Sequence, residues 1–163
     1  MLKIRKALME DVGGITDVYN EAVQNTNATF DTKEKKLDEQ IVWFKSHGPK
    51  NPIIVAERDG LILGWAALSK YDKKNAYSKT AEISLYVKQA YQGQGIGKKL
   101  MNEIIKQGEV AGIHSIVARI TAGNNISIKL HKSVGFEIVG VMKEIGYKFE
   151  RWLDVCFMQK IYK

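Results

Sequence analysis

The sequence is poor in the residues that build disulfides and metal sites. It holds one cysteine, Cys156, so no disulfide can form within the chain and a cysteine-rich zinc site is excluded. Its three histidines, His47, His114 and His131, lie far apart and show no metal-ligand spacing. We therefore expect no bound metal, and we expect Cys156, which has apolar neighbours, to be a core residue.

Long apolar runs are missing as well. The longest runs are a handful of residues, far short of the roughly 20 that a membrane-spanning helix requires. The first six residues alternate between apolar and charged side chains and lack the apolar core of a secretion signal. These absences predict a cytoplasmic protein with no membrane partner.

Arginine is scarce although the chain is basic. The sequence has 25 basic and 18 acidic side chains and a net charge of +7, but 21 of the basic residues are lysine and four are arginine. Proteins that read base edges rely on the forked hydrogen bonding of arginine, and no helix here carries a dense basic stripe. The charge invites a phosphate-bearing partner, and nucleic acid is not the one we expect.

Proline is rare, and its two copies, Pro49 and Pro52, bracket a loop rather than a domain linker. A chain of 163 residues with 45% hydrophobic and 26% charged residues suits one globular domain spanning 1–163. Hydrophobic periodicity predicts six or seven strands and four helices, an α/β or α+β domain with one central sheet. The expected strands span 3–7, 53–57, 61–66, 80–87, 115–121, 136–143 and 151–161, the expected helices 10–23, 37–45, 96–105 and 125–134, and an exposed loop 69–79.

Glycines alternate in the segment 91–99, between an expected strand and an expected helix. Glycines let backbone N–H groups approach an anion, and a helix N-terminus adds positive charge, so this segment favours a phosphate. A Walker loop would need glycine at Gln92 and Ser or Thr at Lys99, and the dinucleotide fingerprint would need glycine at Lys98 or Leu100. Both nucleotide motifs fail, which leaves another phosphate ligand or a turn without a ligand.

The pattern Gln92-x-x-Gly95-x-Gly97 resembles the pyrophosphate loop of the GNAT superfamily of N-acetyltransferases. The segment 124–136, which ends in Gly-Phe, looks like the second cofactor helix of that family. Further segments resemble the phosphinothricin N-acetyltransferase group, so that the resemblance runs from about Ile4 to Gln159. These segments are 29–32, 76–77, 80–82, 130–131 and 148–155.

The resemblance implies a single domain with a mixed, mostly antiparallel sheet, acetyl-CoA as co-substrate and a homodimer. It also implies acetylation of the α-amine of phosphinothricin, methionine sulfoximine or methionine sulfone. The cofactor-binding residues that it implies are Leu85, Tyr86, Val87, Gln92, Gly93, Gln94, Gly95, Ile96, Gly97, Lys98, Asn124 and Ser133. The substrate-binding residues that it implies are Phe30, Asp72, Lys73, Lys74, Glu82, Ile83 and Ser84.

Acetyl transfer needs a base, because a protonated amine cannot attack the thioester. Glu82 is our candidate, since it lies on the polar face of an alternating strand and the resemblance places a carboxylate there; a solvated strand glutamate is the alternative. His131 stands where many superfamily members have a tyrosine that protonates the leaving thiolate, and a structural histidine is equally consistent. Asn124 also suits a helix N-cap, and Trp152 suits packing or a subunit interface.

The sequence departs from the family pattern in the loop that borders the substrate. Related enzymes usually have arginine where Asp72 stands and often proline where Lys73 stands. Aspartate in place of arginine reverses the charge of the loop at this position. An anionic group on the substrate prefers a cation there. The identity of the acceptor therefore stays open. It is either a small amino acid analogue or another amine, namely a protein N-terminus, a polyamine or a drug. The remaining alternative is an acetyl-CoA sensor without catalysis.

Overall fold

The computed structural model describes residues 1–163 and contains one seven-stranded sheet in the order β1-β2-β3-β4-β5-β7-β6. All neighbouring strands are antiparallel except β4 and β5, which run parallel, so the expected mixed and mostly antiparallel sheet is confirmed. The strands are β1 (Lys3–Lys6), β2 (Ile53–Arg58), β3 (Leu61–Lys70), β4 (Thr80–Val87), β5 (Ser115–Thr121), β6 (Glu137–Lys148) and β7 (Arg151–Ile161).

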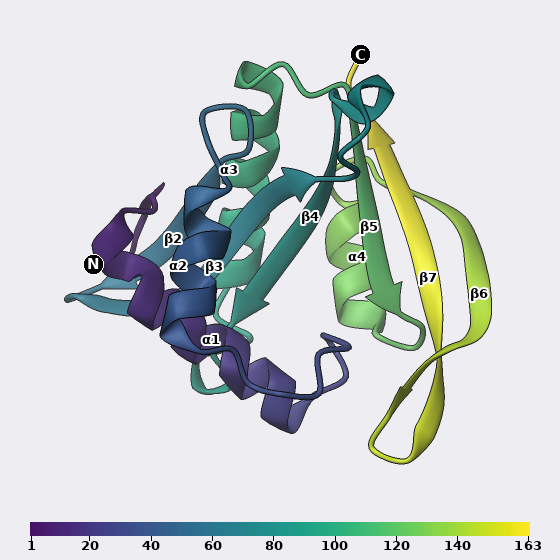
Figure 1. Cartoon of the computed structure of the whole chain (residues 1–163), viewed down its shortest axis with the longest axis horizontal. Helices are drawn as coiled ribbons and strands as arrows, with labels where there is room; N and C mark the ends of the chain where they lie inside the picture. The colour runs from purple at the N-terminus through teal and green to yellow at the C-terminus, as the bar shows by residue number, and fades with distance from the viewer.

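Helices cover both faces of the sheet (Figure 1). Helices α1 (Val12–Asn25) and α2 (Leu37–Lys45) lie on one face, and α3 (Ile96–Val110) and α4 (Asn125–Lys132) lie on the other. Strands β2 and β3 are therefore buried on both sides and read as continuous apolar runs. In β2, Ile54 and Ala56 pack toward α3, whereas Ile53 and Val55 pack toward α1. No helix is long and apolar enough to span a bilayer.

Strands β4 and β5 pair over only three residues each. Thr80–Glu82 lie beside Ser115–Val117, and beyond this contact the two strands separate (Figure 1). β4 continues along β3 to Val87, while β5 continues along β7 to Thr121. The sheet is thus split along one seam, and the free edge of β4 faces the gap.

The strand expected over 136–143 is longer in the structure, where β6 continues to Lys148. A bulge between Met142 and Gly146 interrupts the pairing, after which β6 pairs again with β7. Glu144 takes a positive φ of 49° in this bulge, and its backbone N–H donates to Asp154 at 2.7 Å. The sequence has no glycine at this position that would have predicted the bulge. β3 likewise extends to Lys70, into the expected loop 69–79.

Cys156 lies on β7 and is 3% exposed within the main core, so its expected role as a packing residue is confirmed. The boundaries of other elements differ from expectation by a few residues. The first helix starts at Val12 rather than at residue 10, because Met9–Asp11 form a 3₁₀ turn.

Asp11 ties that turn to β1. Its carboxylate accepts hydrogen bonds from Arg5 at 2.8 and 2.9 Å and from the Leu8 backbone N–H at 2.7 Å. Burial alone would raise the pKa of the Asp11 carboxyl, but the bonds from Arg5 and Leu8 outweigh it and hold the pKa below its ordinary value. The carboxylate therefore stabilises the junction between β1 and α1.

We predict that Asp11→Asn lowers the free energy of unfolding by about 1–2 kcal/mol at pH 7, because the charged partner of Arg5 is lost. The folded-state pKa of Asp11 is depressed, so its contribution is present above the unfolded pKa of about 3.9 and is lost as the pH falls through the folded value. Urea unfolding at pH 7 and pH 3 measures both effects. The exposed Asp17→Asn is the control, and an equal loss in both variants would contradict the assignment.

Candidate active site

The glycine-rich segment forms an open turn between β4 and α3. Gly93 has a φ of 77° and Gly95 a φ of 82°, in the left-handed region that favours glycine. A Cβ atom at either position would meet no atom within 4 Å, so the space above the turn is open. The turn therefore needs these two glycines for its backbone and leaves room for a ligand.

The N-terminus of α3 adds backbone N–H groups without a helical acceptor to this turn. Gly95 supplies no side-chain cap, and the N–H groups of Ile96–Lys98 have no acceptor within the helix. The Lys98 ammonium lies here and donates to the Ser133 hydroxyl at 2.9 Å, which brings together two residues predicted from sequence. Gln92 donates to the Val87 carbonyl at 3.1 Å and fixes the turn to the end of β4. This geometry suits a pyrophosphate.

The free edge of β4 leads from this turn into the molecule. Residues 83–87 pair with β3 on one side only, since β5 has left the other side after Glu82. The backbone groups of Leu85 and Val87 therefore face the gap without a partner strand, whereas those of the predicted residue Tyr86 point to Trp65 on β3. Such an edge can bind an extended ligand arm in the manner of an added strand.

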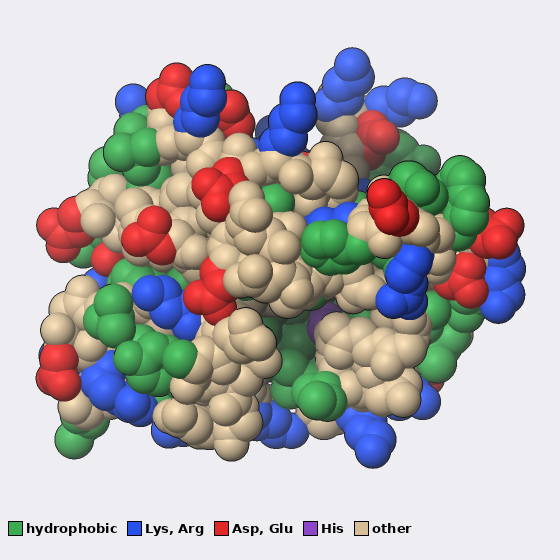
Figure 2. All heavy atoms as spheres, turned by 90° about the horizontal axis from the view of Figure 1, so that it is seen from below, with side chains coloured by type: hydrophobic (Ala, Val, Ile, Leu, Met, Phe, Trp, Pro, Cys, Tyr) green, Lys and Arg blue, Asp and Glu red, His purple; other side chains and the backbone are tan.

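A pocket of about 370 Å³ lies beside this edge, between the loop 26–31, β4, β5 and the β6–β7 hairpin. Seen from below, the molecule is hollowed near its middle, and hydrophobic side chains are visible in the hollow (Figure 2). The pocket brings together the predicted residues Phe30, Glu82 and Tyr86. Its full lining is Ala28, Thr29, Phe30, Glu82, Tyr86, Arg119, Thr121, Ile145, Val155 and Phe157.

Glu82 does not stand alone in this pocket, because Arg119 of β5 pairs with it. The Arg119 Nε lies 2.7 Å from Oε2 of Glu82, and Nη2 lies 2.7 Å from Oε1, a bidentate pair. The hydrogen bonds to Glu82 raise the pKa of Arg119 against the opposing effect of burial. Analysis of the sequence missed Arg119. The alternation of β5, in which Ile116, Ala118 and Ile120 are buried, was the signal that places Arg119 on the face of Glu82.

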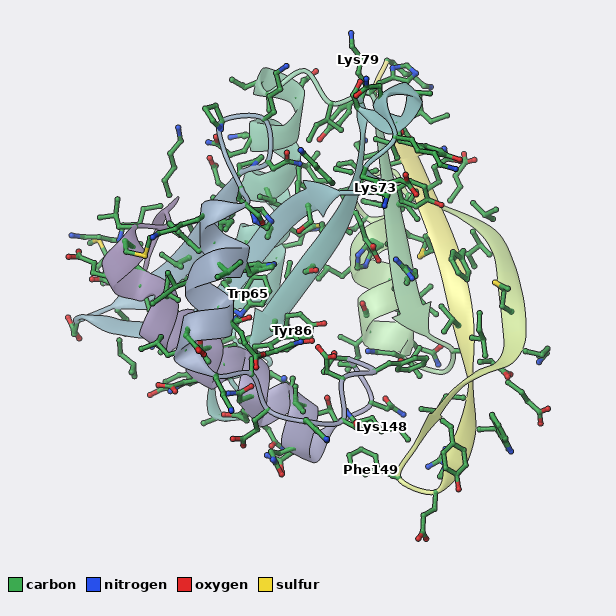
Figure 3. All side chains as sticks on the ribbon, viewed as in Figure 1. Trp65, Lys73, Lys79, Tyr86, Lys148 and Phe149 are labelled. Carbon is green, nitrogen blue, oxygen red and sulfur yellow. The ribbon has the colours of Figure 1, made fainter.

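An aromatic cluster forms the wall behind the pocket. Tyr86 pairs with Trp65 on β3, and their ring centroids lie 5.2 Å apart (Figure 3). Burial raises the pKa of Tyr86 to about 12. Tyr19 of α1 packs on both rings and donates to Asp31 in the loop beside the pocket. The wall is thus rigid and uncharged.

The loop 26–31 is attached to the rest of the pocket at two points. The Thr121 hydroxyl donates to the Asn27 carbonyl at 2.6 Å, and the Lys148 ammonium donates to the Thr29 carbonyl at 2.8 Å. Lys148 is only 5% exposed, and burial lowers its pKa. Figure 3 shows Lys148 at the end of the β6–β7 hairpin beside this loop. These bonds fix Phe30 over the pocket, where it packs against Gly146.

The other predicted substrate residues do not line this pocket. Asp72, Lys73 and Lys74 line a second hollow of about 460 Å³ near the start of β4, and Figure 3 shows Lys73 and Lys79 at that far end. Ile83 is buried in the core on the face opposite Glu82. Ser84 shares the face of Glu82 but does not reach the lining of the pocket. Their roles in substrate binding stay predictions.

His131 is buried at the end of α4. Its Nδ1 lies 2.7 Å from the Ser127 carbonyl, so in the neutral ring this nitrogen carries the hydrogen and donates. Burial lowers the pKa of the ring, and its centroid lies 5.0 Å from that of Phe136. Asn124 accepts from the Ser127 N–H at 3.2 Å, so its expected role as the N-cap of α4 is confirmed. No group of three His, Cys, Asp or Glu side chains is arranged to hold a metal.

Known proteins share this fold and sequence over nearly the whole chain. The L-methionine sulfoximine/L-methionine sulfone acetyltransferase of Salmonella typhimurium is 36% identical over 97% of this chain and 93% of its own length. A crystal structure of an N-acetyltransferase from Staphylococcus aureus matches with a TM-score of 0.95 and 36% identity, covering 100% of this chain and 99% of the other. A phosphinothricin acetyltransferase of Sinorhizobium meliloti, solved in complex with acetyl-CoA, matches with a TM-score of 0.93 and 34% identity over 98% and 88% of the two chains.

The sequence also matches the family model of the acetyltransferase (GNAT) domain over residues 4–157. With a glycine turn, a free strand edge and relatives that bind acetyl-CoA, this chain belongs to the GNAT family and is an acetyl-CoA-dependent N-acetyltransferase.

Proposed function

We propose that the enzyme acetylates the α-amine of a small amino acid or analogue of the methionine sulfoximine, methionine sulfone or phosphinothricin type. The observation that carries this proposal is a pocket of about 370 Å³ with one carboxylate, Glu82, where β4 leaves β5. The volume lies at the small end of ligand pockets, which favours a small acceptor over a peptide. The acetyltransferases of Salmonella typhimurium and Sinorhizobium meliloti that resemble this chain, which act on methionine sulfoximine and sulfone and on phosphinothricin, agree with this acceptor class.

The mechanism that we propose is direct transfer in a ternary complex. Acetyl-CoA supplies the acetyl group as a thioester. The N-terminus of α3 and Lys98 bind the pyrophosphate, and the outward backbone groups of Leu85 and Val87 pair with the pantetheine arm. Glu82 accepts a proton from the acceptor ammonium, directly or through water. The amine nitrogen then bonds to the carbonyl carbon and loses a second proton as the carbon–sulfur bond breaks, and the leaving thiolate takes up that proton.

A backbone N–H at the free edge of β4 is well placed to polarise the thioester carbonyl. The edge N–H groups of Leu85 and Val87 lack a partner strand, and a donor fixed in a strand needs no reorganisation as negative charge develops on the oxygen. We assign this role to the backbone because the one guanidinium in the pocket is paired with Glu82.

We predict that Glu82→Gln lowers kcat by about 10²–10⁴-fold, since a neutral amide cannot accept the ammonium proton. Thiol release from acetyl-CoA is the measurement, with phosphinothricin, methionine sulfoximine, methionine sulfone, common L-amino acids and a polyamine as acceptors. The exposed Glu137→Gln on β6 is the matched control and should retain wild-type rates. Wild-type turnover on the polyamine alone would contradict the acceptor class, and silence on the whole panel with acetyl-CoA still bound would indicate a macromolecular acceptor or a sensor.

The geometry of His131 favours its structural role over thiolate protonation. An acid must carry a proton that it can give away, whereas burial favours the neutral ring, whose one hydrogen is bonded to Ser127. We predict that His131→Gln lowers the free energy of unfolding by about 1–3 kcal/mol at pH 7.5 and changes kcat by less than tenfold.

The pH dependence sharpens the test of His131. Its folded-state pKa is lowered, so the stability from the neutral ring is present above the ordinary pKa of about 6.5 and is lost as the pH falls through the folded value. The stability difference between wild type and His131→Gln should therefore shrink from pH 7.5 to pH 5. The exposed His114→Gln is the control. A loss of kcat above 100-fold with unchanged stability would identify His131 as the thiolate acid.

We also propose that the enzyme is a homodimer. The edge strand β6 and the adjoining part of β7 expose a group of apolar side chains that we call the β6 patch. The patch consists of Ile138, Val139, Val141, Met142, Ile145, Tyr147 and Trp152. So many exposed apolar residues at one edge of the sheet, where β6 has a partner strand on one side only, favour a protein partner, and a second copy agrees with the resemblance to the phosphinothricin acetyltransferase group.

We predict that Val141→Glu in the β6 patch shifts the enzyme from dimer to monomer, because an unpaired charge would be buried at the contact. Sedimentation velocity over a range of concentrations measures the change. Val110→Glu at the end of α3 is the matched control, since Val110 is 86% exposed and lies outside the patch. A monomeric wild-type enzyme at all concentrations would overturn the proposal.

A further inference from the structure

The pocket holds two charges, and they neutralise each other. Among its ten lining residues only Glu82 and Arg119 are charged, and the bidentate contact occupies both carboxylate oxygens of Glu82. Each oxygen keeps a second lone pair through which Glu82 can meet an ammonium group, but that group then competes with Arg119 for the same negative charge. An amine that carries only a positive charge would take Glu82 away and leave Arg119 without a partner.

An α-amino acid carries the matching pair of charges on neighbouring atoms. We propose that the acceptor carboxylate takes the place of Glu82 on the guanidinium of Arg119, while the acceptor ammonium takes the place of Arg119 on Glu82. One ion pair is exchanged for two, so a zwitterion opens the contact without leaving either charge unpaired. This inference rests on the proposed acetylation of amino acids and identifies the residue that recognises their acid group.

Arg119 is suited to this role by its chemistry and position. Its planar fork binds a carboxylate through two parallel hydrogen bonds, which it already does with Glu82 at 2.7 Å. Its side chain is 53% exposed, so a ligand can reach it, whereas that of Glu82 is 25% exposed. It lies two residues beyond Val117, the last residue of β5 that pairs with β4, and therefore in the gap where acceptor and thioester would meet.

No other cation in this part of the molecule is free to bind the carboxylate. Lys148 is 5% exposed, donates to the Thr29 carbonyl and does not line the pocket. Lys73 and Lys74 line the second hollow, near the start of β4. The Lys98 ammonium lies at the N-terminus of α3 against Ser133. The choice of Arg119 follows from these positions.

The exchange predicts selectivity against amines that lack a free acid group. Such an acceptor competes for the two charge-assisted hydrogen bonds between Arg119 and Glu82, and it supplies no carboxylate as a new partner for Arg119. Because Arg119 is partly exposed, water compensates for some of the loss, and we expect a factor of about 100 in kcat/KM rather than the larger ratios of fully buried sites.

The test compares three acceptors that differ only at the acid group. They are L-methionine sulfone, its methyl ester and 3-(methylsulfonyl)propylamine, the amine that remains without the carboxyl group. Thiol release should show kcat/KM about 100-fold higher for the acid than for the other two in the wild-type enzyme. In Arg119→Gln the ratio should fall to about 1, chiefly through a higher KM for the acid. Arg58→Gln on β2, which removes the same charge far from the pocket, should keep the wild-type ratio.

Calorimetry gives a readout that does not depend on turnover. L-methionine sulfone should bind to the wild-type enzyme and to Arg58→Gln with equal affinity, and about 100-fold more weakly to Arg119→Gln. Equal kcat/KM for acid and ester in the wild type, or a loss in Arg119→Gln that lies in kcat for all three acceptors, would overturn the inference and leave the proposed function standing. No thiol release with any of the three would overturn both.

Discussion

The site depends on the early separation of two parallel strands. β4 and β5 pair for three residues each and then follow different neighbours, β3 on one side and β7 on the other. The separation frees one edge of β4, leaves space for the pocket and sets Arg119 opposite Glu82. The gap is possible because each strand keeps a full antiparallel partner on its other side, so neither strand loses both ladders of backbone hydrogen bonds. A fully paired sheet would fill the space that the pocket occupies.

Opposite demands on rigidity and openness are met by separate parts of the fold. β2 and β3 are buried on both faces and carry the core, while the aromatic rings of Trp65 and Tyr86 extend that core to the pocket wall. The open parts, the glycine turn and the free strand edge, are made of backbone groups, and the Gln92 side chain joins them through its bond to the Val87 carbonyl. Long-range bonds then join the loop 26–31 to β5 and β6, so the pocket is closed by segments more than ninety residues apart in sequence.

Local patterns in the sequence predicted the elements, the glycine turn and the face of Glu82. Residues 80–87, 37–45 and 151–161 form the expected strands and helix with the expected bounds, because alternation and helical spacing are local signals. The pairing of Glu82 with Arg119 was not predicted, since it depends on the register between two strands separated by a whole helix. The bulge at Glu144 and the packing of Phe30 on Gly146 also depend on distant partners. Asp72 and Lys73, which came from the family resemblance of their loop, line a second hollow, and their contact with a substrate stays a prediction.

The burial of Cys156 has a consequence for an enzyme of this chemistry. Each turnover frees a thiol, coenzyme A, next to a protein whose own thiol lies 3% exposed inside the core. Thiol–disulfide exchange requires an accessible thiolate, so Cys156 is shielded from mixed disulfides with the product under oxidising conditions. The protein is thereby protected from covalent inactivation by its own product. The same burial keeps the Cys156 thiol of the folded protein from reacting with dyes that detect free thiols.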